Sequence, residues 1–72
     1  MSIVALVQVT LNAEKREVAV GTTVVDVIGM LDLDGRRIAV EINGAIIARE
    51  SYAARALEDG DVVEVVHFVG GG

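Results

Sequence analysis

Residues 62–72 read VVEVVHFVGGG, an apolar run typical of a β-strand that passes directly into three glycines. Side chains alternate between the two faces of a strand. One face of strand Val62–Phe68 then carries Val63, Val65 and His67, and the other carries Val62, Glu64, Val66 and Phe68. Whichever face is covered, the other leaves valines exposed. Such a patch is typical of a protein-binding surface, although single exposed valines are also ordinary strand formers.

Working outward from this strand, the pattern of apolar residues predicts four more strands and one helix. The expected strands are Ile3–Leu11, Glu17–Val20, Ile38–Ile42 and Ala45–Ala48, with a turn at Asn12-Ala13-Glu14 between the first two. Asn43-Gly44 joins the last two, and an Asn-Gly pair predicts a type I′ hairpin turn. Thr22 or Thr23 caps a helix that runs to about Leu31, because its hydroxyl accepts hydrogen bonds from free backbone N–H groups. Val24, Val27, Ile28 and Leu31 form the apolar stripe of this helix.

Residues 49–58 are expected to form a short helical turn anchored by Tyr52 and Leu57, and Asp59-Gly60-Asp61 forms a turn before the last strand. The order is hairpin, helix, hairpin, short crossover and strand. One helix covers only one face of a sheet. By analogy, this order predicts an α+β, β-grasp (ubiquitin-like) fold with a mixed sheet of four to five strands, in which the last strand lies centrally and parallel to the first. Residues 1–68 form the domain and residues 69–72 a flexible tail.

Length and composition restrict the class of protein. The chain has 72 residues, which is enough for one domain, and it contains no cysteine. Its net charge of −5 makes nucleic acid an unsuitable partner, since phosphate binding needs a basic surface. The charge is compatible with a basic protein partner and also with a simple role in solubility. The N-terminal sequence lacks a signal peptide and its apolar run is too short to span a membrane, so we expect a cytoplasmic protein.

The residues offer no arrangement typical of catalysis. A single histidine, His67, makes no metal cluster, and we expect it to be an ordinary strand-end residue. The carboxylates are scattered over turns and helix ends. Arg36, Arg37, Arg49 and Arg55 are expected to be solvated, although Arg36 and Arg37 could also meet an acidic partner surface. No glycine-rich phosphate loop precedes a helix.

The glycine tail is the remaining candidate site. Gly72 carries a carboxylate at neutral pH, and a carboxylate must be activated, usually by adenylation, before a nucleophile attacks it. Glycines lack a Cβ, so such a tail can thread a narrow channel and leave its terminal carbonyl unshielded. An inert, disordered end is the alternative explanation.

Three stretches of the chain resemble the ThiS family, the sulfur carrier proteins of bacterial thiamine biosynthesis: REVAVGTTVVDVI (residues 16–28), RRIAVEINGAIIARESYA (residues 36–53) and LEDGDVVEVVHFVGGG (residues 57–72). The last stretch is the most specific. Ala48 stands where the family often has proline, and the first strand is a few residues longer.

The resemblance implies a mechanism and a set of partners. An E1-like enzyme would adenylate Gly72 with ATP, and sulfur from a cysteine desulfurase would convert it to a thiocarboxylate that thiazole synthase consumes. Gly70 and Gly71 would form the thread, and Phe68, Val69, Val66 and Val62 would bind the partners. The chain itself would be a carrier and cosubstrate rather than an enzyme, with ATP bound by the activating partner and no cofactor of its own.

Two other functions remain alternatives. The small subunit of molybdopterin synthase shares the fold and the tail chemistry, although His67-Phe68-Val69 differs from its usual ending. A ubiquitin-like modifier would instead form isopeptide bonds to lysines. A β-grasp interaction module with an inert tail is the third possibility.

Overall fold

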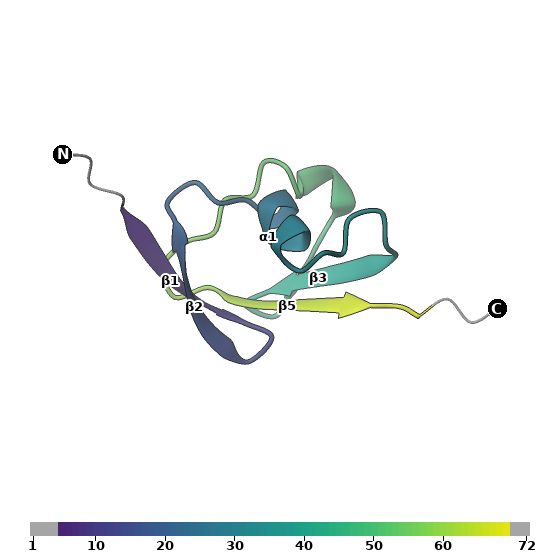
Figure 1. Cartoon of the computed structure of the whole chain (residues 1–72), viewed down its shortest axis with the longest axis horizontal. Helices are drawn as coiled ribbons and strands as arrows, with labels where there is room; N and C mark the ends of the chain where they lie inside the picture. The colour runs from purple at the N-terminus through teal and green to yellow at the C-terminus, as the bar shows by residue number, and fades with distance from the viewer. Residues whose placement is uncertain (1–4, 70–72) are drawn as a thin grey trace.

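The computed structural model describes residues 5–69, which form five strands, one α-helix and one 3₁₀ helix (Figure 1). Their bounds in chain order are β1 Leu6–Leu11, β2 Glu14–Ala19, α1 Val24–Met30, β3 Ile38–Ile42, β4 Ala45–Ile47, η1 Arg49–Ser51 and β5 Val62–His67.

The five strands form one mixed sheet in the order β2-β1-β5-β3-β4. β5, the last strand of the chain, lies between the two hairpins, parallel to β1 and antiparallel to β3. Figure 1 shows α1 over β3 and β5, while the β1–β2 hairpin leaves them at an angle. This arrangement confirms the predicted β-grasp fold, including the central position of the last strand.

Two-residue turns close both hairpins. Asn43 and Gly44 have φ values of 53° and 85°, which confirms the predicted Asn-Gly turn. Asn12 and Ala13 also have positive φ values, 48° and 70°, so the first hairpin is equally tight. β2 therefore starts at Glu14, and the prediction that it starts at Glu17 and ends at Val20 was wrong. The predicted turn at Asn12-Ala13-Glu14 is present, but it occupies only Asn12 and Ala13, because Glu14 already belongs to β2.

The predicted helix cap is present at Thr23. Thr23 Oγ1 accepts from the backbone N–H of Asp26 at 3.3 Å, and the Asp26 carboxylate accepts from the backbone N–H of Thr23 at 2.9 Å. This reciprocal capping box satisfies two backbone donors that the first turn leaves free. Val24, Val27 and Ile28 of α1 are buried, as the apolar stripe predicts.

The core lies between α1 and one face of the sheet. Val40 and Val63, from neighbouring strands β3 and β5, are among its most deeply buried side chains. Tyr52 and Leu57 are also buried, which confirms them as the anchors of the crossover after η1. With a single helix on one side, the opposite face of the sheet remains open.

Candidate functional site

β5 carries the chain towards the predicted tail. It pairs with β3 over five residue pairs and with β1 over two. Pairing continues one residue beyond the strand, because the backbone N–H of Phe68 donates to the carbonyl of Arg37 at 2.9 Å. Val69 follows with 83% of its surface exposed. The predicted site residues Gly70, Gly71 and Gly72 lie outside the described residues.

The four predicted docking residues, Val62, Val66, Phe68 and Val69, are all exposed, and we call them the docking patch. Val63 and Val65 are buried against α1, so alternation places Val62 and Val66 on the open face of the sheet. About half of each of these two valine side chains is exposed to solvent. An apolar surface of this kind on a small domain is suited to binding another protein.

A pair of carboxylates lies within the open face. Glu64 of β5 is directly opposite Glu41 of β3, and Ile46 of β4 is opposite Glu41 on the other side. Ile46 is 70% exposed. Directly opposed like charges destabilise a sheet. The open face therefore combines apolar side chains with a concentrated negative charge.

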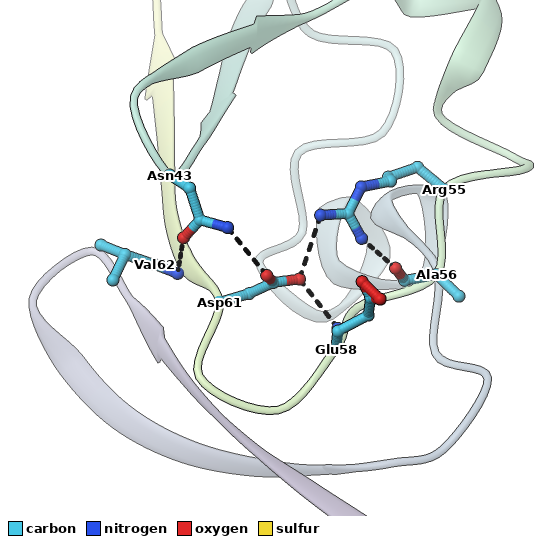
Figure 2. A network of polar contacts seen from close by, with 6 residues as sticks. All are labelled: Asn43, Arg55, Ala56, Glu58, Asp61 and Val62. Carbon is cyan, nitrogen blue, oxygen red and sulfur yellow. Dashed lines mark hydrogen bonds and ion pairs between the residues drawn. The ribbon is translucent and has the colours of Figure 1, made fainter.

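A buried carboxylate fixes the start of β5 (Figure 2). Asp61 Oδ1 accepts from the Asn43 side-chain amide at 2.9 Å. Its Oδ2 accepts from the backbone N–H of Glu58 at 2.8 Å and from Arg55 Nη2 at 3.2 Å. Arg55 also donates to the carbonyl of Ala56. Asp61 thus joins the β3–β4 turn to the loop before β5.

The turn asparagines hold β5 between the two hairpins. Asn43 Oδ1 accepts from the backbone N–H of Val62 at 2.9 Å, and Asn12 Oδ1 accepts from the backbone N–H of Val65 at 2.8 Å. Each asparagine therefore closes its own hairpin and also binds a donor of the central strand. The position from which the tail departs is consequently determined by both halves of the sheet.

Burial alone would raise the pKa of Asp61, because it disfavours the charged form. Hydrogen bonds from Glu58 and Asn43, together with the charge of Arg55, outweigh burial and hold the pKa below its usual value of 3.8. Asp61 is therefore ionised at neutral pH, and its contacts indicate a structural role rather than proton transfer.

This network corrects two expectations. Arg55 is not simply solvated, since it forms an ion pair with a carboxylate that is only 5% exposed. Asp61 is more than a turn residue. Its hydrogen bonds come from Asn43 in another hairpin, 18 residues away, and from Arg55, six residues away, so no local turn pattern pointed to it. His67 is the last residue of β5, opposite Ile38, as expected of a strand-end residue.

No helix within residues 5–69 has the length and apolar character that a membrane span requires. In the same part of the chain, no three His, Cys, Asp or Glu side chains are grouped so that they could hold a metal ion.

Similarity to known proteins identifies the family of this chain. The model of the ThiS family matches residues 9–72, which run from the second half of β1 through every later element to the three glycines. The sulfur carrier protein ThiS of Bacillus subtilis is 44% identical over 50 residues, which cover 69% of this chain and 76% of that protein.

Two further comparisons extend this result. A thiazole synthase of Paramagnetospirillum magneticum is 42% identical over 65 residues, covering 90% of this chain and 20% of that protein, so the chain spans about a fifth of that relative's length. The crystal structure of the thiamine biosynthesis protein ThiS of Geobacter metallireducens superposes with a TM-score of 0.71 at 31% identity, covering 90% of this chain and 99% of that one. The chain belongs to the ThiS family.

Proposed function

We propose that the chain is a sulfur carrier protein of thiamine biosynthesis and that its reactive group is the carboxylate of Gly72. One observation carries this proposal: the family match continues beyond the folded domain to residue 72 and includes the three glycines. The ThiS protein of Bacillus subtilis, similar over 50 residues, is named for the same role.

The chemistry has two steps on the terminal carbonyl. The carboxylate first attacks the α-phosphorus of ATP, which releases pyrophosphate and gives an acyl adenylate. With hydrosulfide as the minimal sulfur donor, HS⁻ then attacks the carbonyl carbon, AMP leaves with the bonding electron pair, and one proton is lost. The product is a thiocarboxylate on Gly72. No atom of the folded domain reacts, so the chain acts as a cosubstrate and its partners supply the catalysis.

The position of β5 supports this role. Within residues 5–69, Phe68 donates the last backbone hydrogen bond that follows β5, and four residues of the sequence come after it. Four extended residues span at most about 13 Å, which is enough to reach into an active site while the domain stays outside. The docking patch lies on the strand that leads into this tail, so a protein that receives the tail meets the exposed apolar side chains first.

We propose three partners: an E1-like adenylating enzyme that binds the ATP, a sulfur source fed by a cysteine desulfurase, and a thiazole synthase that accepts the sulfur. The last is favoured because two thiazole synthases, from Paramagnetospirillum magneticum and Magnetococcus marinus, contain a stretch similar to this chain. All three steps use cytoplasmic metabolites, and we propose the cytoplasm as the site of action.

The intact mass of the protein from its native host tests the proposal. Replacement of one terminal oxygen by sulfur adds about 16 Da, the same nominal shift as oxidation of one of the two methionines. The shift must therefore map to Gly72 and disappear after alkylation with a thiol-selective reagent. The matched control is the chain without Gly72, which is expected to fold normally and to show no alkylatable product.

A plain carboxylate that persists with the activating enzyme, ATP and a sulfur source would contradict the proposal. High-mass adducts on denaturing gels would indicate a ubiquitin-like modifier instead. Sulfur transfer retained by the chain without Gly72 would exclude the terminal carboxylate as the reactive group.

A further inference from the structure

A surface cavity of about 450 Å³ opens between α1, the loop that leads into β3, and η1. Its apolar wall includes Ile28, Ile38 and Tyr52. Ile28 and Tyr52 belong to the buried core, so this wall is a fixed part of the fold. The cavity lies on the helix side of the sheet, opposite the open face that carries Val62 and Val66.

Three exposed arginines, Arg36, Arg37 and Arg49, line the cavity, and we call it the arginine cavity. They are half of the six basic residues in a chain whose net charge is −5. Within residues 5–69 none of the three forms an ion pair, whereas Arg16 and Arg55 each pair with a carboxylate. Asp34 is the one acidic residue of the lining, which leaves a formal charge of 3 − 1 = +2 there.

Guanidinium groups bind carboxylates and phosphates through two parallel hydrogen bonds. The apolar wall selects a ligand that also has an apolar part. Inorganic phosphate is polar on every side and leaves the apolar wall uncovered, whereas a carboxylate side chain with an apolar neighbour can contact both parts of the lining.

The arginine cavity lies close to the exit of the tail. Arg37 accepts the last backbone hydrogen bond of the β5 pairing, from Phe68, and Ile38 is opposite His67. Figure 1 shows the start of β3 and the end of β5 at the same end of the sheet. A protein that draws in the tail therefore also comes close to the three arginines.

We propose that the arginine cavity binds an acidic segment of the protein that receives the tail, with a carboxylate between the guanidinium groups and an apolar side chain against Tyr52. This inference rests on the proposed function for the identity of the partner. The cavity supplies a second contact on the helix side of the sheet, independent of the docking patch on β5.

The test is an NMR titration of the full 72-residue chain with an acetylated and amidated hexapeptide of alternating leucine and glutamate. The same peptide with glutamine in place of glutamate is the control ligand. We expect the acidic peptide to shift the amide signals of Ile38, Arg49 and Tyr52 at concentrations up to about 5 mM, which mostly fill a site with a Kd of about 1 mM.

Charge variants localise the binding. The double variant Arg36→Gln/Arg49→Gln is expected to weaken it about fivefold, within the range of exposed ion pairs. Lys15→Gln is a matched control, because Lys15 is exposed on β2 and does not line the cavity. We expect it to change the affinity less than about twofold. Dispersed spectra of all variants establish that they are folded.

Several results would overturn the proposal: no shift around the cavity, an equal effect of the glutamine peptide, or an equal loss in Lys15→Gln. Tighter binding of inorganic phosphate at the same signals would indicate a phosphate site. Binding that appears only after residues 70–72 are deleted would identify the chain's own tail as the occupant. The titration uses unactivated protein, so its result does not depend on whether Gly72 can be loaded with sulfur.

Discussion

At the scale of single residues, Asp61 determines where the central strand begins. It is a buried carboxylate held by one backbone donor and two side chains, and its removal would leave the partly buried Arg55 without its carboxylate partner. Breaking such a pair costs more than the pair itself contributes, because an uncompensated charge remains.

Asp61→Asn is therefore expected to lower the free energy of unfolding by about 2 kcal/mol at neutral pH, measured by urea denaturation. Asp59→Asn is the matched control from the same turn. Asp59 accepts a hydrogen bond from the backbone N–H of Gln8 at an exposed position, and its replacement should cost less than about 1 kcal/mol. Equal losses in the two variants would contradict the special role of Asp61.

The same residue predicts a pH dependence. The folded state lowers the pKa of Asp61 below 3.8, so the folded state binds this proton less tightly than the unfolded state. Its stabilising contribution is complete above about pH 5 and is lost as the pH falls through the folded pKa. The stability difference between the wild type and Asp61→Asn should shrink as the pH falls below 3.8. A difference that stays constant down to pH 2 would refute this assignment.

The proposed chemistry predicts the effect of a substitution at Gly71. Gly71→Val adds a branched side chain to a segment that must pass a narrow channel, so adenylation by the activating enzyme should slow at least about tenfold. The measurement is the rate of ATP–pyrophosphate exchange, with the thermal midpoint as the control for folding. An unchanged exchange rate would argue against threading of the tail.

At the scale of elements, β5 combines a buried face with an exposed one. Phe68→Ala is expected to weaken binding of the activating enzyme about tenfold, because half-exposed aromatic side chains are frequent anchors of interfaces. Its effect on folding should stay below about 1 kcal/mol, since Phe68 is not part of the core. Calorimetric titration gives the affinity and urea denaturation the stability.

A matched pair of variants controls this experiment. Val66 and Val20 are similarly exposed, at 54% and 61%, and only Val66 lies on β5. Val66→Ala should weaken the complex while Val20→Ala leaves it unchanged. Equal affinities for both variants would remove β5 from the interface.

For the opposed carboxylates of β3 and β5, one substitution is expected to raise the stability of the fold and to slow association with a partner. Glu64→Gln removes the repulsion from Glu41 and should stabilise the fold by about 0.3 kcal/mol. The same change should slow association with a basic partner surface, because it removes part of the attractive field. Urea denaturation and stopped-flow association at low salt measure the two effects, and a loss of stability would contradict the repulsion.

The sequence predicted those elements whose signals are local. The Asn-Gly turn, the Thr23 cap and the apolar stripe of α1 depend on residues at most a few positions apart, and all three were found. The turn after the first strand was also predicted, at Asn12-Ala13-Glu14, but the start of β2 was placed three residues late, because residues 14–16 include no apolar side chain that would mark a strand. Asp61 and the second role of the turn asparagines were missed because their partners come from other elements.

At the scale of the whole molecule, the topology places the proposed reactive tail after the central strand of the sheet. β5 is the one described strand that contacts both hairpins, and it is also the strand that leads to the tail. The surface features of the molecule therefore differ in how far the sequence alone predicts them. Alternation along β5 predicted that one of its faces leaves valines exposed, whereas the arginine cavity required the assembly of α1, η1 and the loop before β3.

The central position of β5 also has a mechanical consequence. A partner that draws the tail inwards pulls along the axis of β5, which is paired with β3 over five residues and held at its start by Asn43 and Asp61. A load in this direction shears several hydrogen bonds at once instead of opening them one after another. The domain can thus withstand a pull on the segment that follows β5 while its fold stays intact.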